Sequence, residues 1–298
     1  MPVKFIRVFF AILVASSLQA QTSSHTWAHL IRDLAFGRAV AVDANGNSYF
    51  TGYYYQTVKI GSTVLTNKGT ADIYLAKFDA TGNPFWARSA GGSGYDVPSR
   101  NAVDASGNCY LTGSFNGSAA FGSRTVSSAG ATDGFVAKYD TAGECAWVVA
   151  IGGRYADEVR GVTTDARGNC YVTGTFGDAF ILSNGQLISS SGGTDFFIVK
   201  ISPAGTILWA AQGGGSGDDA GVGVTVDARG AVYVTGNFTA SMRIGSTVLT
   251  PNGTDNTASD MFIAKYDSMG TPLWAHQSKG RAYVRGISTD ASGNSTVT

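Results

Sequence analysis

The sequence repeats itself with a period of about 61 residues. The segment 42–52 returns as 103–113, recurs twice more with substitutions, and begins a fifth time near residue 289. Its leading aspartates are separated by 61, 61, 62 and 63 residues and are Asp43, Asp104, Asp165, Asp227 and Asp290. All five tryptophans fall on the same grid: Trp27, Trp86, Trp147, Trp209 and Trp274. Such a period predicts a repeat architecture in which each unit needs its neighbours to bury its apolar surface.

Each unit reads as four short strands. In the third unit we expect strands at 161–164, 170–176, 195–201 and 207–211, with an insertion between the second and third. Tight turns that carry Gly in the fourth position join the first pair and the last pair. Hairpin connections of this kind predict antiparallel four-stranded sheets. When such sheets stand around an axis they form a β-propeller, so the predicted fold is an all-β propeller of four-stranded blades.

Composition supports this class and excludes others. Hydrophobic residues make up 44% of the 298 residues and aromatic residues 11%, which is too much for a disordered chain. Lys and Arg together number 21, as do Asp and Glu, so the net charge is zero. Nucleic acid and anionic membrane surfaces are therefore not expected partners. An odd set of three cysteines predicts small buried groups and no disulfide: Cys109, Cys145 and Cys170.

The first twenty residues predict a secretory signal peptide. Lys4 and Arg7 precede an apolar run at 8–18, and small residues lead to a cleavage point after Ala20. The run is too short to span a bilayer, and no later apolar stretch approaches that length. We therefore expect residues 21–298 to be exported to the periplasm, the cell surface or the medium, without a transmembrane segment.

The repeated motifs resemble a known family. The pattern Asp-x-x-Gly-Asn-x-Tyr-Val-Thr-Gly is followed by Ile-Gly-Ser-x-x-Leu-Thr, then by Asp-x-Phe-Ile-Ala-Lys-Tyr-Asp and Trp-Ala, with clear instances of the third motif at 133–140 and 260–267. This order resembles the bacterial β-propeller repeat (SBBP repeat) over nearly the whole mature chain. The third unit departs from it at Ser202–Pro203 and at 182–185. The resemblance implies an exported or surface-attached bacterial protein and implies no catalytic residues.

The number of units leaves two interpretations open. The four full units span roughly 38–90, 98–151, 159–212 and 221–277, and partial segments lie at 284–298 and 26–31. Joined into one blade, the two partial segments would still lack a third strand. Either a five-bladed ring closes imperfectly, or the chain is a piece of a longer propeller. We favour the second, because a stop inside a strand leaves unpaired backbone groups at an edge.

The glycine-rich connections between units carry the candidate binding residues. An aspartate lies eight residues before the leading aspartate in three units: Asp96, Asp157 and Asp219. An arginine lies five residues before it, also in three units: Arg38, Arg160 and Arg285. In a propeller these positions approach the central channel at one face, where ligands commonly bind. The two sets predict either a site for a cation or polar ligand or, as the favoured interpretation, a collar of mutual salt bridges.

Two further segments lie near the insertions. The sequence at 60–66 reappears unchanged at 244–250, which predicts a packed hairpin rather than a variable recognition loop. The run 53–55 consists of three tyrosines. Such aromatics can stack on sugars, and packing on an outer strand is the favoured interpretation.

No catalytic or metal site emerges from the sequence. The Asp-Ala-x-Gly-Asn turns resemble calcium loops, but they lack a closing acidic residue and flanking helices, and Arg167 and Arg229 occupy a would-be ligand position. No triad order, zinc spacing or phosphate-binding loop is found. The predicted function is an exported, non-catalytic scaffold, without cofactor, that binds a protein or a glycan. The alternative is a glycosidase or lyase that uses Asp96, Asp157 and Asp219.

Overall fold

The described part of the chain consists of β-strands and turns and contains no helix. It comprises residues 34–252, 259–290 and 293–298 of a computed structural model. The all-β class predicted from the sequence is confirmed. The predicted signal peptide at 1–20, the segment 26–31 and Trp27 lie outside the described residues.

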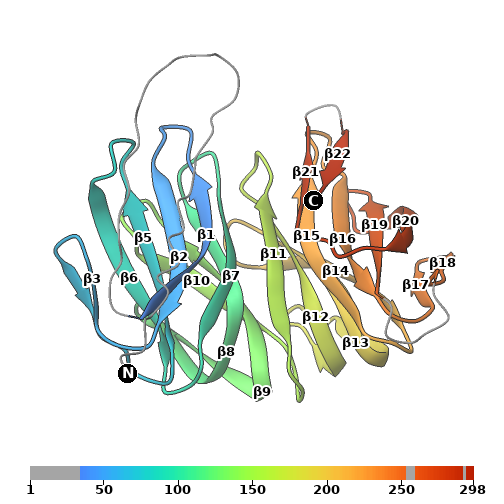
Figure 1. The fold of residues 1–298 in the computed structure, drawn as a ribbon, viewed down its shortest axis with the longest axis horizontal. Helices are drawn as coiled ribbons and strands as arrows, with labels where there is room; N and C mark the ends of the chain where they lie inside the picture. The colour runs from blue at the N-terminus through green and yellow to red at the C-terminus, as the bar shows by residue number, and fades with distance from the viewer. Residues whose placement is uncertain (1–33, 253–258, 291–292) are drawn as a thin grey trace, which may run out of the picture.

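Four groups of four antiparallel strands follow one another along the chain, and pairing between the first two groups joins them in one eight-stranded sheet (Figure 1). We call each group with its connections a unit. The first unit has strands β1 (Ala35–Val42), β2 (Ser48–Tyr54), β5 (Asp72–Phe78) and β6 (Pro84–Gly92). The second has β7 (Val97–Val103), β8 (Cys109–Phe121), β9 (Arg124–Tyr139) and β10 (Cys145–Ile151). The third has β11 (Glu158–Thr164), β12 (Cys170–Ile181), β13 (Leu187–Ile201) and β14 (Ile207–Gly215).

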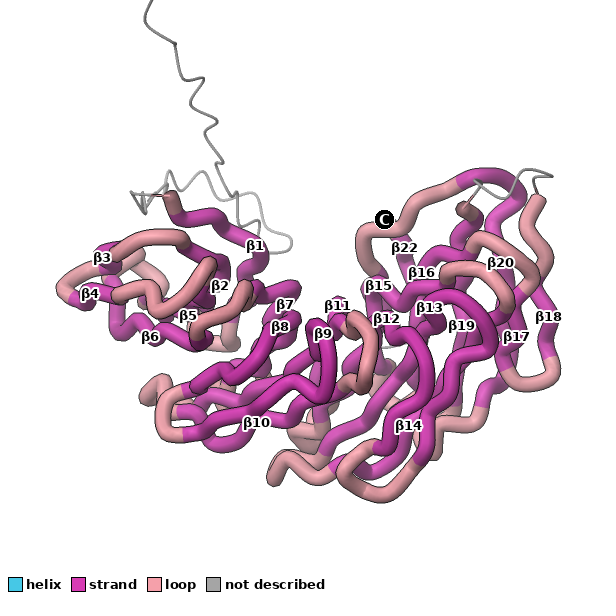
Figure 2. The backbone as a smooth tube through the Cα atoms, turned by 90° about the horizontal axis from the view of Figure 1, so that it is seen from below, coloured by secondary structure: helices cyan, strands magenta, loops and turns pink. Residues whose placement is uncertain are grey.

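The fourth unit has β15 (Asp219–Val226), β16 (Val232–Phe238), β19 (Asp260–Tyr266) and β20 (Pro272–Arg281). A two-stranded sheet follows, formed by β21 (Ile287–Thr289) and β22 (Ser295–Val297). Small hairpins are inserted in the first and fourth units and are β3 (Val58–Ile60) with β4 (Thr63–Leu65) and β17 (Met242–Ile244) with β18 (Thr247–Leu249). The units stand side by side in an arc, with β1, β7, β11 and β15 along its inner side (Figure 2).

The leading aspartates form hairpin turns, as the sequence predicts. The Asp104 carboxylate accepts hydrogen bonds from the main-chain N–H groups of Ser106 (3.0 Å) and Asn108 (2.9 Å). Gly107 has φ of 80°, a left-handed conformation that favours glycine. The same turn recurs at Asp165, where the main-chain N–H of Arg167 donates to the carboxylate (2.9 Å). These carboxylates are thus occupied in Asx turns.

Three of the four apolar clusters among the described residues span successive units, and the fourth lies within the first unit around its inserted hairpin. Tyr110 and Val136 of the second unit pack in one cluster with Val172, Phe176 and Phe197 of the third, and all five are fully buried. The other junctions are built in the same way. Complete burial of one such side chain stabilises the folded state by about 2 kcal/mol. The second, third and fourth units therefore share cores with their neighbours, whereas the first unit also buries apolar side chains against its own inserted hairpin.

The glycine-rich connections extend the fourth strands further than the sequence analysis predicted. The predicted strand 207–211 continues in β14 to Gly215, where it pairs with Met242 of the next unit. A Cβ on Gly215 would lie 2.0 Å from the main-chain oxygen of Ser241, so only glycine permits this approach. In the third unit, the predicted insertion is itself part of the long strands β12 and β13. The predicted packed hairpin at 244–250 is confirmed, because Ile244 and Leu249 are buried.

The tryptophans of the repeat pack against the next unit. The indole N–H of Trp86 donates to the main-chain oxygen of Thr141 (3.1 Å) in the β9–β10 turn. In the same way, the indole N–H of Trp147 donates to the main-chain oxygen of Pro203 (3.0 Å), and that of Trp209 donates to the main-chain oxygen of Ser268 (3.1 Å). Trp274, in the fourth unit, packs beside the ring of Tyr233. These half-buried indoles tie each unit to the following turn.

The three cysteines are free and buried within the described chain. Burial raises the pKa of the Cys109 and Cys145 thiols to about 12, so they stay protonated and unreactive. Cys170 lies in the same inter-unit core as Phe176. They behave as the small buried groups that the sequence predicts.

Substitution of Gly143 tests the contact between a tryptophan and the next turn. A Cβ at Gly143 would lie 2.8 Å from the Trp86 ring, whereas one at Gly117 would meet nothing within 4 Å. Both glycines have positive φ. We expect Gly117→Ala to lower the free energy of unfolding by about 1 kcal/mol and Gly143→Ala by roughly 2–3 kcal/mol, because the ring must also move. Urea unfolding measures both, and equal losses would contradict the contact.

Candidate functional site

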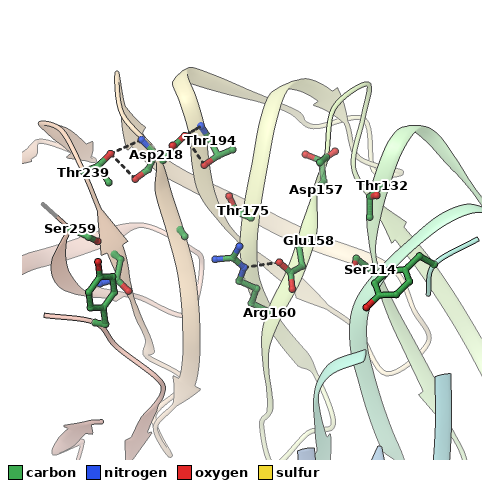
Figure 3. A pocket seen from close by; sticks show the side chains of 15 residues that line it. Ser114, Thr132, Asp157, Glu158, Arg160, Thr175, Thr194, Asp218, Thr239 and Ser259 are labelled. Carbon is green, nitrogen blue, oxygen red and sulfur yellow. Dashed lines mark hydrogen bonds and ion pairs between the residues drawn. The ribbon is translucent and has the colours of Figure 1, made fainter. Parts of the chain in front are cut away.

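A cavity of about 760 Å³ opens where the connections between units converge (Figure 3). It lies among the starts of β7, β11 and β15, the middles of β8 and β12 and the end of β16. Its walls include hydroxyl and amide side chains from three units, namely Ser114, Thr132, Thr175, Thr194, Asn237, Thr239 and Ser259. The cavity is therefore built by the repeat, and these polar groups stand in a lining whose surface is largely apolar.

Six of these seven hydroxyl and amide residues occupy two fixed positions of the repeat, which the sequence analysis missed. Ser114, Thr175 and Asn237 each follow the Thr-Gly pair that ends the repeated segment. A second set comes directly before the aspartate of the third strand and comprises Thr132, Thr194 and Ser259. Polar residues that recur at these two positions were the available signal. Because the units stand side by side, each position projects toward the same cavity.

The charged side chains of the cavity are bonded to neighbours. Arg160 Nε lies 2.9 Å from Glu158 Oε2, and both side chains are half-buried. Asp218 accepts hydrogen bonds from the main-chain N–H (3.0 Å) and the hydroxyl (3.3 Å) of Thr194. The Asp218 main-chain N–H donates to the hydroxyl of Thr239 (2.8 Å). The charges are thus held in place and partly neutralised before any ligand arrives.

Exposed aromatic rings lie beside the cavity. Tyr95 lines it and is 43% exposed, and Tyr283 lines it from the segment before β21. The Tyr95 ring centroid lies 6.3 Å from that of Tyr53, which stacks on Phe36 at 5.1 Å. A hydrogen bond with Tyr55 raises the pKa of the Tyr95 hydroxyl to about 12. The favoured interpretation of the tyrosine run as outer-strand packing is therefore correct only for the buried Tyr54.

The aspartates predicted at the channel rim are instead buried at the junctions between units. Asp96, Asp157 and Asp219 are at most 1% exposed, and Asp157 alone among them borders the cavity. Asp96 accepts main-chain hydrogen bonds from Gly92 (2.7 Å) and Asn116 (3.2 Å). The backbone therefore satisfies most of these carboxylate oxygens, which the sequence does not reveal.

The predicted arginines lie apart from those aspartates. Arg160 borders the cavity and pairs with Glu158, while Arg38 lies over the Tyr53 ring at 5.2 Å. The main-chain oxygen of Arg285 accepts a hydrogen bond from the Arg100 guanidinium, which reaches across from β7. Within the described ranges, no ion pair joins the two predicted sets. The predicted ring of salt bridges between these aspartates and arginines does not form among the described residues.

The leading aspartates stabilise the opposite ends of the units. The Tyr110 hydroxyl donates to the main-chain oxygen of Gly168 (2.9 Å) in the next unit and lies 3.3 Å from Asp104 Oδ2. Lys138 Nζ lies 5.2 Å from the Tyr110 ring centroid and 3.9 Å from the same carboxylate oxygen. Burial raises the pKa of the Tyr110 hydroxyl, so it remains a donor. Asp104 and its equivalents are therefore structural residues.

The cavity presents groups that can form hydrogen bonds and rings that can stack on a ligand. Hydroxyl and amide groups both donate and accept hydrogen bonds, and tyrosine rings can stack on a sugar ring. No group of three or more His, Cys, Asp or Glu side chains converges on a metal position in the part of the chain that is described. The described residues also contain no helix of the length and apolarity that a membrane span requires.

Comparisons with known proteins give distant relatives. No family model matches the chain. An uncharacterized WD repeat-containing protein of Acanthamoeba polyphaga mimivirus is 26% identical over 319 residues, covering 85% of this chain. The regulatory protein FlaEY of Caulobacter vibrioides is 31% identical over 111 residues, covering 36% of this chain. The chain spans only 23% and 12% of the lengths of these two relatives.

Two solved structures show weak likeness. A protein of unknown function from Bacteroides caccae is 13% identical, with a TM-score of 0.38 and 85% of both chains covered. The WD40 domain of Pan2 from Neurospora crassa is 10% identical, with a TM-score of 0.32 and coverage of 88% of this chain and 86% of that chain. Both TM-scores are too low to establish a shared fold.

The tyrosine link between units can be tested against a matched tyrosine. Tyr110→Phe removes a hydroxyl that bonds to the next unit, so we expect a loss of about 1–2 kcal/mol in the free energy of unfolding. The Tyr139 hydroxyl is buried without a hydrogen-bond partner. Tyr139→Phe should therefore be neutral or stabilising. Thermal and urea unfolding of the two variants compare them, and a larger loss for Tyr139→Phe would contradict the assignment.

Proposed function

We propose that this chain is a non-catalytic scaffold of the β-propeller type that binds a glycan in the 760 Å³ cavity. The observation that carries the proposal is the convergence of hydroxyl and amide side chains from three units on one cavity. A neutral, hydroxyl-rich ligand matches those groups without requiring a net charge in the protein. Tyr95 and Tyr283 add exposed rings at the same place.

The propeller arrangement is supported by the way in which the units meet. Each is a group of four antiparallel strands, and the inner strands β1, β7, β11 and β15 lie next to one another in chain order. The mimivirus relative also bears WD repeats in its name, and its alignment covers most of this chain. By resemblance to the bacterial β-propeller repeat, we propose that the chain belongs to that family. We also propose four complete blades, one for each full unit.

An extracellular or cell-surface location fits a glycan-binding scaffold. The basic residues Lys4 and Arg7, the apolar run 8–18 and Ala20 support export with cleavage before Gln21. Expression with the native N-terminus in a secreting bacterial host tests this directly. Protein recovered outside the cytoplasm with Gln21 at its N-terminus is the expected result, and an intact Met1 on cytoplasmic protein would contradict it.

Binding can be tested with neutral oligosaccharides and two alanine variants. Tyr95→Ala removes a ring from the cavity, while Phe85→Ala removes a 60% exposed ring from the opposite end of the adjacent strand β6. Loss of one stacking ring costs about 1 kcal/mol, so we expect several-fold weaker binding for Tyr95→Ala and unchanged binding for Phe85→Ala. A glycan array followed by calorimetry makes the comparison. Equal effects, or no glycan binding at all, would contradict the cavity as the site.

The enzyme alternative receives less support from the geometry. The carboxylates Asp96, Asp157 and Asp219 are almost wholly covered by protein, so they have little access to a glycosidic bond. Analysis of oligosaccharide products after long incubation with the purified chain separates the two functions. Unchanged oligosaccharide supports a binding scaffold, whereas turnover that Asp157→Asn abolishes would replace that proposal with an enzyme.

A further inference from the structure

Each junction between the first four units contains two buried aspartates. One lies at the same position of the third strand in the preceding unit, and the other closes the connection into the next unit. The pairs are Asp72 with Asp96, Asp133 with Asp157, and Asp195 with Asp219. All six are at most 2% exposed. Carboxyl groups are rarely buried so completely unless a partner balances their charge.

At the first two junctions the two carboxyl groups of a pair face the same point. At the first junction, Asp72 Oδ1 and Asp96 Oδ2 lie 2.5 and 2.9 Å from the point that a Cβ on Gly91 would occupy. At the second, Asp133 Cγ and Asp157 Oδ2 lie 2.8 and 2.7 Å from the corresponding point at Gly152. Both acids therefore face the same small volume, and glycine leaves room for them there.

Main-chain N–H groups bond to these carboxyl groups but leave specific oxygens unpartnered. Asp72 Oδ2 accepts from Lys68 (2.8 Å), and both oxygens of Asp96 accept main-chain hydrogen bonds, whereas Asp72 Oδ1 has no hydrogen-bond partner. The second junction repeats this arrangement. There Asp133 Oδ2 accepts from Ala129 (2.9 Å), and Oδ1 has no partner.

The third junction differs in which acid lacks partners. The main-chain N–H groups of Ser191 (2.6 Å) and Gly215 (3.2 Å) donate to Asp195. The oxygens of Asp219 make no hydrogen bond of good geometry, although the main-chain N–H groups of Gly215 and Thr239 face them and lower the pKa of this carboxyl group. No Lys or Arg among the described residues forms an ion pair with any of the six acids. At the first two junctions an unpartnered carboxyl oxygen thus faces a second carboxyl group that can accept a hydrogen bond, and at the third the charge of Asp195 acts on Asp219.

We propose that each of these three junctions binds one proton between its two carboxyl groups, so that the packing of the units is coupled to pH. The protonated members are Asp72, Asp133 and Asp219, each of which donates its O–H to the carboxylate of its partner. Two like charges in one buried volume repel, and a shared proton removes the repulsion while satisfying the unpartnered oxygen. The coupling belongs to the junctions and does not depend on what the cavity binds.

The surrounding charges agree with proton binding. Burial raises the pKa of Asp72 to about 6 and that of Asp219 to about 7, and the neighbouring acid of each pair raises it further. At the second junction burial raises the pKa of both acids, and the charge of Asp133 contributes to raising that of Asp157 to about 6. Lys68 is the cation that faces Asp72 and lowers the pKa of its carboxyl group. Additional carboxylates, Asp178 and Asp218, face the second and third junctions and favour the protonated form there.

A proton fits these junctions better than a calcium ion does. Calcium takes six to eight oxygen ligands, whereas each junction offers two carboxyl groups whose other oxygens mostly face N–H donors. No cluster of three acidic or metal-binding side chains was found among the described residues.

The expected effect on stability has a definite sign. A carboxyl group whose pKa is higher in the folded state than its value of about 4 in the unfolded chain favours folding below pH 4. That contribution is lost as the pH rises through 6 to 7. The aspartates in the turns affect stability in a lower pH range. Hydrogen bonds from the Asn83 side chain and other groups lower the pKa of Asp79 to about 2, so its contribution to stability is lost only below pH 4. Between pH 8 and pH 5 the pH dependence of stability should therefore come mainly from the junctions. The free energy of unfolding should increase as the pH falls from 8 to 5.

The fourth unit supplies a matched control. Asp260 occupies the same strand position as Asp72 and is equally buried, but Ala282 stands where the other junctions have their second aspartate. Asn252 donates its main-chain N–H (2.7 Å) and its side-chain amide (2.6 Å) to Asp260 Oδ2. Asp260→Asn should therefore destabilise the chain at every pH, because it weakens charge-assisted hydrogen bonds.

Asparagine variants of the protonated members provide the test. An asparagine amide imitates the protonated acid by donating N–H to the partner carboxylate, so Asp72→Asn, Asp133→Asn and Asp219→Asn should each remove part of the gain in stability between pH 8 and pH 5. Asp219→Asn should remove more of it than Asp72→Asn, because the pKa of Asp219 is the higher. The triple variant should be at least as stable as the unmodified chain at pH 8 and show little of this gain. Urea unfolding at both pH values measures this, with Asp260→Asn expected to retain the full gain.

Infrared difference spectroscopy tests the proton itself. The unmodified chain should show the carbonyl band of a protonated carboxyl group that disappears with a midpoint between pH 6 and 7, and the triple variant should lack this band. This readout decides the proposal even if the triple variant does not fold. Absence of the band at pH 5, or an undiminished gain in stability in all three single variants, would overturn the proposal. Calcium-dependent stabilisation at pH 8 that the single variants abolish would also overturn it, in favour of a metal site.

Discussion

The structure depends on one interaction, which is the apolar packing of each unit against the next; one core cluster of the described residues lies within a single unit, the first. Tyr110 and Val136 of one unit complete the core of the next, beside Phe176 and Phe197. Because every unit must present matching surfaces to its neighbours, the same residues recur with a period of about 61. Much of the stability of the folded chain therefore comes from the junctions between units.

The junctions also explain residues that look unrelated in the sequence. Gly215 allows the end of β14 to pair with the next unit, and a Cβ there would lie 2.0 Å from Ser241 O. Trp86 reaches the following turn, and Asp96 collects N–H groups from both sides of its junction. Because these contacts recur in each unit, the cavity at one end of the junctions is also built from recurring positions.

Much of the fold follows from the sequence, and the site only in part. The turn at Asp165 and the start of β12 were predicted because Asx turns and alternating strands leave local signals. The extension of β14 to Gly215 was not, since a glycine run resembles a loop until a neighbouring backbone is placed against it. Asp157 was expected at a channel rim, and its burial became evident only with the N–H donors of Gly153 and Gly177. The hydroxyls of Thr175 and Thr194 were overlooked, although both occupy repeated positions.

Small-angle X-ray scattering of the purified chain tests most directly whether the units pack against one another. Units that share cores along a compact arc should give a radius of gyration of about 20 Å, close to the value for a globular protein of this length. The pair-distance distribution should then have a single maximum. A radius well above roughly 30 Å, with separate maxima for individual units, would show that each sheet stands alone and would contradict the shared cores.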